Sequence, residues 1–284
     1  MGWEIMDNMK TDPSRTSSIR LRFLRDLRKR ILAIRNKTVA LIKSDPFGIN
    51  QNKFTLNAVT YDWKYSTSSE KLKAFQAWFK EQVDTEMLET VGDFGDTPWL
   101  AEYVHSAYVL GINRAYMDAK KKDAIGNKEV WDATRAEFVA TMLALPRTVQ
   151  SIRLMYLRSF ESLDGINAEM ASSLSRIMAN GLAHGISIKN LVREVSTTID
   201  TISKDRAHKI VRTEIIHAHA EAQLDAFERL GVEKLGVLAE WSTAKDDRVC
   251  KRCAKMEGKI FTIAEARGKI PLHVMCRCTW IPSK

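Results

Sequence analysis

All four cysteines of this 284-residue chain lie in its last 35 residues, and they fall into two groups. Two residues separate Cys250 from Cys253. After nineteen intervening residues His273 precedes Cys276 at the same spacing, and one residue separates Cys276 from Cys278. Two thiolates at this spacing bind one metal ion from a tight turn, and a second ligand pair from a distant segment completes a tetrahedral site. The spacing therefore predicts a small, metal-stapled module at this end of the chain.

Zn²⁺ is the ion expected in such a Cys/His site, with a structural role, because a module of this size has too small a core to be stable alone. Five candidate ligands compete for four places. Cys250, Cys253 and Cys276 are the best-supported ligands, while His273 and Cys278 compete for the fourth position. His273 is favoured because Cys276 and Cys278, in an extended segment, would point their thiols to opposite faces.

Other interpretations of the cysteines are a redox pair, four buried free thiols, or disulfides formed outside the cell. A redox pair is disfavoured because no βαβ pattern surrounds the Cys-x-x-Cys. A catalytic zinc is disfavoured because the ligand set looks closed and no general base stands at a fixed offset. Structural zinc is the preferred interpretation.

The formal net charge of the chain is +9, and all of it comes from one stretch. Between Arg15 and Lys43 there are ten basic residues and one acid, so the rest of the chain nets to zero. Apolar residues recur here at alternating intervals of three and four, which predicts one amphipathic helix over residues 19–42 with a narrow apolar seam. The seam consists of Leu24, Leu27, Ile31, Ile34 and Leu41, with Thr38 in the gap.

Three interpretations of this basic helix stay open. In the first, the charges form a solvated helix face. In the second, the helix contacts the phosphates of double-stranded DNA without reading its sequence. In the third, the apolar seam packs on an acidic protein partner and the basic residues set the orientation. Nine net charges on one helix argue against the first. The residues assigned to DNA or partner binding are Arg15, Arg20, Arg22, Arg25, Arg28, Lys29, Arg30, Arg35 and Lys37.

The predicted fold is mainly α, with a helical N-terminal body and a small C-terminal α+β zinc-binding module. Helical patterns follow one another to residue 230, and short stretches of strand composition come after it. The predicted helices beyond the basic one are 68–90, 97–121, 128–144, 147–162, 165–182, 188–200 and 203–230. The predicted strands are 235–242, 258–262 and 279–282.

Three segments are expected along the chain. They are a basic amphipathic arm at 1–48, a helical body at 49–164, and a C-terminal domain at 165–284 that includes the Cys/His module at 235–284. No apolar stretch reaches the roughly 20 residues of a membrane-spanning helix, and the start lacks the pattern of a signal peptide. The chain is expected to fold in a cytoplasm, away from membranes.

Five sequence pieces occur in order in the C-terminal domain. They are Ile210-Val-Arg-Thr-Glu-Ile-Ile-His-Ala, Phe227-Glu-Arg-Leu-Gly-Val, Trp241-Ser-Thr-Ala-Lys-Asp-Asp-Arg-Val-Cys-Lys-Arg-Cys, Met256-Glu-Gly-Lys and His273-Val-Met-Cys-Arg-Cys. In this combination the chain resembles the phage head morphogenesis family, the Mu F-like minor head proteins. It departs from the family at Val274, where Pro is common.

The resemblance implies a minor capsid protein of the virion, at the head interior or portal vertex, assembled in the host cytoplasm. The implied partners are the portal protein, capsid and scaffold proteins, and packaged DNA, with effects on DNA packaging or delivery. No enzymatic activity is implied. Structural roles are expected for Arg212, Glu214, Trp241 and Asp246. The alternative function is a zinc-dependent nucleic-acid-binding protein or nuclease-like enzyme.

Overall fold

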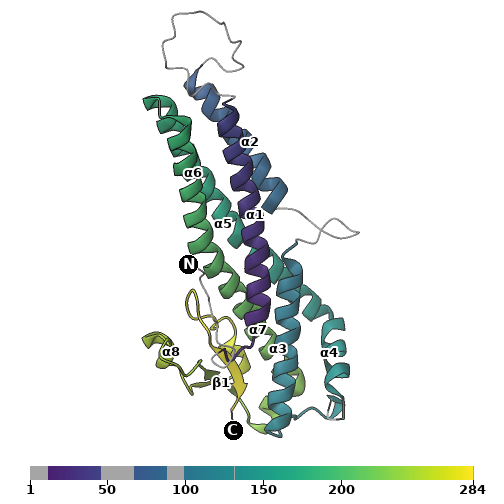
Figure 1. Ribbon diagram of the computed structural model, residues 1–284. Coiled ribbons are helices and arrows are strands. Elements are labelled where there is room, and N and C mark those ends of the chain that lie inside the picture. The colour runs from purple at the N-terminus through teal and green to yellow at the C-terminus, as the bar shows by residue number, and fades with distance from the viewer. Residues whose placement is uncertain (1–11, 46–66, 88–98, 131, 284) are drawn as a thin grey trace, which may run out of the picture. The chain divides into compact units, whose positions relative to one another are not determined.

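The computed structural model describes residues 12–45, 67–87, 99–130 and 132–283 (Figure 1). Within these residues the chain is mainly helical and ends in a small sheet, as predicted. The long helices are α1 (Ser17–Ser44), α2 (Ser68–Met87), α3 (Ala101–Lys121), α4 (Arg135–Ala144), α5 (Pro146–His184), α6 (Ile188–Ile202) and α7 (His208–Leu230). The shorter elements are η3 (Lys128–Val130), η4 (Ser203–Ala207), η5 (Val232–Leu235), α8 (Lys251–Ala254) and α9 (Ile263–Ala266).

Two helix predictions need correction. The predicted helices 147–162 and 165–182 are one continuous helix, α5. Gly165 does not interrupt it, because the buried residues Leu163, Ile166 and Met170 keep helical spacing across the glycine. The helix expected from residue 128 begins instead at a capping box, in which Thr134 and Glu137 satisfy each other's backbone N–H groups. The predicted start at Thr97-Pro98 lies outside the described residues.

The chain divides into two compact units, each built from segments that are distant in sequence. Unit 1 comprises residues 1–23, 100–159 and 209–284, and unit 2 comprises residues 24–99 and 160–208. The division by sequence into segments 1–48, 49–164 and 165–284 stays a prediction. Among the described helices, none is long and apolar enough to cross a bilayer.

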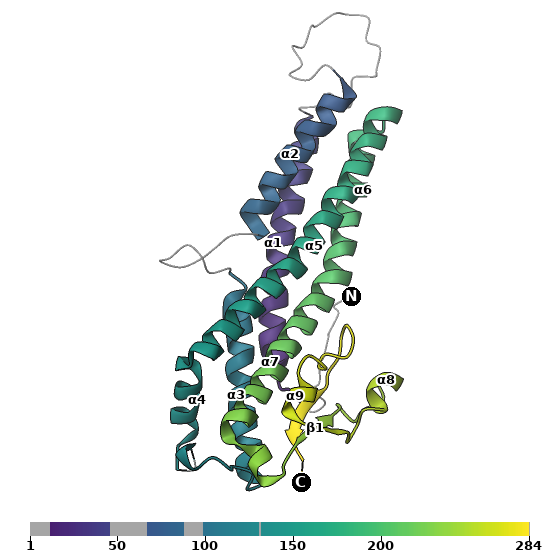
Figure 2. The ribbon, with the colours of Figure 1, turned by 180° about the vertical axis from the view of Figure 1, so that it is seen from behind.

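Unit 2 is a helical bundle formed by α2, α6 and the unit's parts of α1 and α5 (Figures 1 and 2). Each helix contributes apolar side chains at intervals of three and four residues to a shared core. The core includes Leu27, Ile31 and Ile34 of α1, Phe75, Phe79 and Val83 of α2, Met170, Leu174 and Met178 of α5, and Leu191, Val195 and Ile199 of α6. The apolar seam of the basic helix is thus buried inside the chain from Leu24 to Thr38, whereas Leu41 is half-buried and its neighbour Ile42 is the buried residue at that end.

In unit 1, α3 and α7 come into close backbone contact at Gly111. A Cβ added there would lie 2.4 Å from the carbonyl oxygen of His219 and 2.7 Å from the Ala222 Cβ. Glycine is therefore required at this position for the two helices to pack as they do. Tyr108, one turn earlier on α3, donates its hydroxyl proton to Asp225 of α7. This helix pair is the base on which the C-terminal sheet rests.

The sheet has the strand order β2-β1-β3 and is antiparallel throughout. Its strands are β1 (Ala239–Ser242), β2 (Ile260–Phe261) and β3 (Thr279–Pro282), which lie inside the three predicted stretches. Trp241 pairs with Trp280 across β1 and β3. Gly258, at φ +74°, turns the chain back toward β1, where its N–H donates to the Trp241 carbonyl (2.9 Å).

Candidate metal centre

The candidate ligands come from two segments that the sheet brings together. Cys250 caps the N-terminus of α8, where its Sγ accepts a hydrogen bond from the Cys253 N–H (3.4 Å). Met275, at φ +69°, lies in a turn in which the Cys276 N–H donates to the His273 carbonyl (3.1 Å). The first segment follows β1 and the second precedes β3. Because β1 and β3 are paired, the two ligand segments are held close together.

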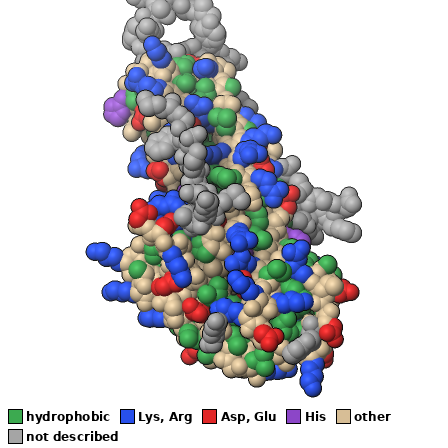
Figure 3. Space-filling view, turned by 60° about the horizontal axis from the view of Figure 1, so that its bottom comes forward, with side chains coloured by type: hydrophobic (Ala, Val, Ile, Leu, Met, Phe, Trp, Pro, Cys, Tyr) green, Lys and Arg blue, Asp and Glu red, His purple; other side chains and the backbone are tan. Residues whose placement is uncertain are grey.

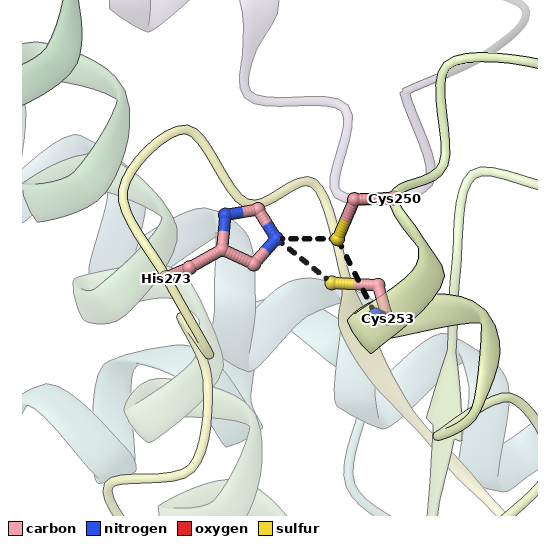
Figure 4. Close-up of side chains that lie close together, drawn as sticks. All are labelled: Cys250, Cys253 and His273. Atoms are coloured by element: carbon pink, nitrogen blue, oxygen red, sulfur yellow. Dashed lines mark hydrogen bonds between the residues drawn. The ribbon is translucent and has the colours of Figure 1, made fainter.

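His273 faces both thiols of the Cys-x-x-Cys pair (Figure 4). Its Nε2 lies 3.1 Å from the Cys250 Sγ and 3.0 Å from the Cys253 Sγ. Its other ring nitrogen, Nδ1, lies 2.6 Å from the carbonyl oxygen of Val274. Because a carbonyl only accepts hydrogen bonds, Nδ1 carries the proton and the Nε2 lone pair is directed at the thiols. A histidine that ligates a metal through Nε2 has this arrangement.

Cys253 also belongs to a second group, with Cys276 and Cys278. The ligand atoms within each group lie within 4.8 Å of one another, and the sulfurs of Cys253 and Cys276 are 3.8 Å apart. Two thiolates on one tetrahedral Zn²⁺, each at about 2.3 Å, would be separated by about 3.8 Å. The sulfur spacing therefore fits a shared metal ion.

The prediction that Cys276 and Cys278 point their thiols to opposite faces, which favoured His273 as the fourth ligand, is wrong. The thiols of Cys276 and Cys278 do not point to opposite faces, since both lie in the group that contains Cys253. Side chains alternate only within a strand, and β3 begins at Thr279, after both cysteines. His273 and Cys278 both remain candidates for the fourth place.

The three clustered thiols are buried, with exposed fractions of 1–3%. Hydrogen bonds with Cys276 and Cys278, together with burial, raise the pKa of Cys253. The hydrogen bonds from Cys253 and Cys278 lower the pKa of Cys276. The thiols thus cannot all ionise together without a cation between them. A divalent metal removes this conflict, because it binds the thiolates and releases their protons.

Asp246, one of the predicted structural residues, is held by Arg277. The guanidinium Nη1 and Nη2 donate to the two carboxylate oxygens at 2.6 Å each. These hydrogen bonds hold the pKa of Asp246 well below its usual range. Asp246 also accepts a hydrogen bond from the Arg248 N–H (3.1 Å). The pair therefore ties the loop before α8 to the cysteine segment before β3.

Trp241, also predicted as structural, is fully buried on β1. Its ring meets Trp280 of β3 edge to face, with centroids 5.3 Å apart and an angle of 83° between the planes. Trp280 in turn meets Phe261 of β2 at 5.8 Å and 78°. One aromatic side chain from each strand thus builds the core of the sheet, and edge-to-face pairs add to the stability of their burial.

Arg212 and Glu214 lie on α7. Glu214 is buried, with 5% of its side chain exposed, and accepts a hydrogen bond from Arg158 Nε (2.9 Å). Arg158 belongs to α5, so this ion pair joins two helices of unit 1. Arg212 is half-buried on the same helix as Glu214. A structural role for both residues stays a prediction.

The chain itself engages four of the nine basic residues assigned to DNA or partner binding. Arg20 is 5% exposed and donates to the Asp12 carboxylate (2.6 Å). Arg30 donates to the Glu86 carbonyl (2.6 Å) and lies over the Trp99 ring. The other two form the ion pairs Arg35–Asp200 (3.3 Å) and Lys37–Glu86 (2.8 Å).

The remaining five basic residues are accessible. Arg28 is half-buried, and the exposed residues are Arg15, Arg22, Arg25 and Lys29. The helix face that carries the apolar seam is covered by the chain, so a partner would meet the charged side of α1 and not its seam. The structure therefore does not gather the nine residues into one surface.

Sequence reasoning missed Gln223, a fully buried residue of α7. Its Oε1 accepts hydrogen bonds from the Thr279 hydroxyl (2.7 Å) and the Trp280 N–H (3.2 Å), and its Nε2 donates to the Trp280 carbonyl (2.8 Å). One side chain thus satisfies both backbone groups of Trp280 and fastens β3 to α7. The available signal was a glutamine among apolar residues on the inward face of a helix.

Comparison with known proteins gives one family. Residues 173–281 match the model of the family described as Phage Mu protein F like protein. The matched range begins within α5 and extends into β3, so it includes α7 and every candidate metal ligand. Comparisons with curated proteins and with solved structures found no match.

Proposed function

Residues 173–281 belong to the Phage Mu protein F like family, and on this premise we propose that the chain is a minor head protein of a bacteriophage. It acts in head assembly as a structural component and not as an enzyme. The observation that carries the proposal is the family match across the whole ligand-bearing module. The chain would accordingly be part of the virion, in the head interior or at the portal vertex.

The proposed metal is a structural Zn²⁺. The donors are thiolates and one imidazole, a set that suits zinc and needs no redox chemistry. Three of the five candidate ligands are buried, which favours a closed site over one that admits a substrate. When bound, the ion would join the loop at α8 to the segment before β3 and so stabilise the sheet.

The proposed protein partners are the portal and the capsid or scaffold proteins. A head component of low copy number needs a defined place in the shell, and contacts with these proteins would supply it. Because the seam of α1 is buried, the contact would use exposed polar surfaces of the chain. Mixed polar and charged surfaces of this kind give orientation and specificity to an interface.

Contact with packaged DNA is proposed as a second, weaker role. The exposed residues Arg15, Arg22, Arg25 and Lys29 are available for phosphates, and such contacts would not read sequence. Figure 3 shows a face on which Lys and Arg side chains are interspersed with apolar and acidic ones. With four exposed basic residues on offer, the expected DNA affinity is modest, and it falls with rising salt with a slope set by the number of phosphates contacted.

Two experiments test the proposed function. Mass spectrometry of purified heads should find the chain in few copies, and a portal pull-down from infected cells should retain it. Particles made without the chain should form shells that package or deliver DNA poorly, whereas normal infectivity would contradict the proposal. Plasmid cleavage by the purified protein with a divalent metal, lost on Cys253→Ser, would favour the nuclease-like alternative.

A further inference from the structure

A groove of about 620 Å³ follows one face of α3. Leu110, Arg114, Met117 and Lys121 line it at helical intervals, and α3 rises about 16 Å from the first to the last of them. Leu110 is half-buried and Met117 is 49% exposed, so the groove has an apolar strip. None of the candidate metal ligands lines this groove.

The lining of the groove is strongly basic. It includes one acid, Asp118, and that acid pairs with Arg114 (2.8 Å). Across the groove from α3, the turn before α1 and the first residue of α4 add further positive charge. The basic lining residues are Arg15, Arg114, Lys120, Lys121 and Arg135. Three of them, Arg15, Lys121 and Arg135, are exposed and form no ion pair with any residue that the structure describes.

The backbone of Arg15 is held in an unusual conformation. Its φ is +56°, in the left-handed region, which costs a residue with a side chain about 1 kcal/mol. A buried network maintains the turn: Asp12 accepts hydrogen bonds from the Ser14 N–H (3.2 Å) and hydroxyl (2.6 Å), and the Ser14 and Thr16 hydroxyls are 2.9 Å apart. The fold thus maintains a strained turn that presents Arg15 to the groove, and such strain concentrates at binding sites.

We propose that this groove binds an acidic, amphipathic helical segment of a partner protein. The apolar side chains of such a segment would lie on Leu110 and Met117, which are about 10 Å apart along α3. Its carboxylates would pair with Arg15, Lys121 and Arg135. An exposed Met suits this role because its flexible thioether adapts to different apolar side chains.

The groove fits a peptide better than a DNA duplex. A duplex presents phosphates on a convex surface, and its apolar groups, the thymine methyls, lie inside the major groove, where the lining of a concave groove on the protein does not reach them. A helix laid in a groove, by contrast, uses apolar anchors on one face and charges on the flanks. The groove therefore differs from the exposed charged face of α1 in that its apolar side chains and its basic residues line one concave surface.

The test is a fluorescence anisotropy titration of the full chain with three probes. The first is a helix-forming Glu-rich peptide with two Leu residues spaced like Leu110 and Met117. The second is a peptide of equal charge in which Ser replaces both Leu residues, and the third is a short DNA duplex. The proposal expects the first peptide to bind at least about tenfold more tightly than the second.

Variants locate the binding. The groove variant Arg15→Glu/Lys121→Glu/Arg135→Glu should lose about tenfold or more in affinity for the Leu-containing peptide. Met117→Ser should lower the affinity for the Leu-containing peptide and leave the affinity for the Ser-containing peptide unchanged. The matched control Lys73→Glu/Lys189→Glu/Arg193→Glu changes the net charge equally at exposed positions outside the groove and should bind as the unchanged chain does.

Circular dichroism of each variant must first match that of the unchanged chain. Equal loss in the groove and control variants would overturn the proposal, because the effect would then come from net charge alone. Tighter binding of the duplex than of the Leu-containing peptide, lost in the groove variant, would also overturn it and assign the groove to nucleic acid.

Discussion

Arg277 and Asp246 form a two-point ion pair in which each of two guanidinium nitrogens lies 2.6 Å from a different carboxylate oxygen. The side chains are 9% and 11% exposed, so the pair is almost excluded from water. Arg277 stands between Cys276 and Cys278 in the sequence, and its pairing with Asp246 orients the segment that carries both thiols. The geometry of the candidate metal site therefore depends on a salt bridge beside it.

Asp246→Asn should destabilise the sheet module by about 2 kcal/mol, because it leaves Arg277 buried without its counter-charge. The depressed pKa of Asp246 means that this contribution is present at neutral pH and is lost in acid, as the pH falls through that pKa. Hydrogen exchange of residues 239–282 would measure the loss. Asp247→Asn, at the exposed neighbour, is the control and should have no effect.

The chain should bind about one zinc ion, and Cys253→Ser should abolish binding and unfold the sheet, because Cys253 belongs to both ligand groups. The helices of unit 2 should survive, since no candidate ligand lies in that unit. Native mass spectrometry would count the metal, and hydrogen exchange would locate the unfolding. A folded sheet in the metal-free protein would contradict the structural role.

The fourth ligand can be assigned by paired substitutions. If His273 is the fourth ligand beside Cys250, Cys253 and Cys276, His273→Ala should lower the zinc affinity strongly and Cys278→Ser only slightly. The reverse order of effects would assign Cys278 as the fourth ligand. Competition with a chelator would measure both affinities. The metal in each variant should also be probed spectroscopically after substitution with Co²⁺, whose absorption bands report the number of thiolate ligands.

Stability should fall as the pH drops from about 6.5 to 4, because His219 stays neutral in the folded chain. Burial lowers the pKa of His219 to about 4, so over this range the unfolded chain binds a proton that the folded chain does not. The expected loss at pH 4 is about 3 kcal/mol. Thermal unfolding against pH should show this slope in the unchanged chain and a flatter one in His219→Leu. His184→Leu, at an exposed histidine, should keep the slope of the unchanged chain.

The local features of the fold could be predicted from the sequence. Helical spacing located the helices, the strand stretches contained β1, β2 and β3, and the Cys and His spacing selected residues that the structure does bring together. The helix and strand signals are local because each depends on residues close in sequence. The ligand signal joins two segments, but it is readable because one metal ion imposes a fixed geometry and spacing on its ligands.

Long-range pairing could not be predicted. Arg20, Arg30, Arg35 and Lys37 look like one charged surface with Arg22 and Arg25, because charge alone does not say which cation will find an internal acid. Their acidic partners lie outside α1: Asp12 in the turn before it, Glu86 on α2 and Asp200 on α6. The continuity of α5 was missed for a related reason, since burial on both sides of Gly165 outweighs the helix propensity of one glycine.

Two glycine substitutions should have opposite effects on stability. Gly111→Ala should destabilise unit 1 by about 2–3 kcal/mol, because the new Cβ would meet the backbone of His219 at 2.4 Å and force α3 away from α7. Gly165→Ala should stabilise α5 by up to about 1 kcal/mol, because nothing lies within 4 Å of the new Cβ and alanine favours the helix. Denaturant unfolding of both variants would measure the two shifts. A neutral Gly111→Ala would mean that α3 and α7 are less closely packed in solution than the contact at this glycine requires.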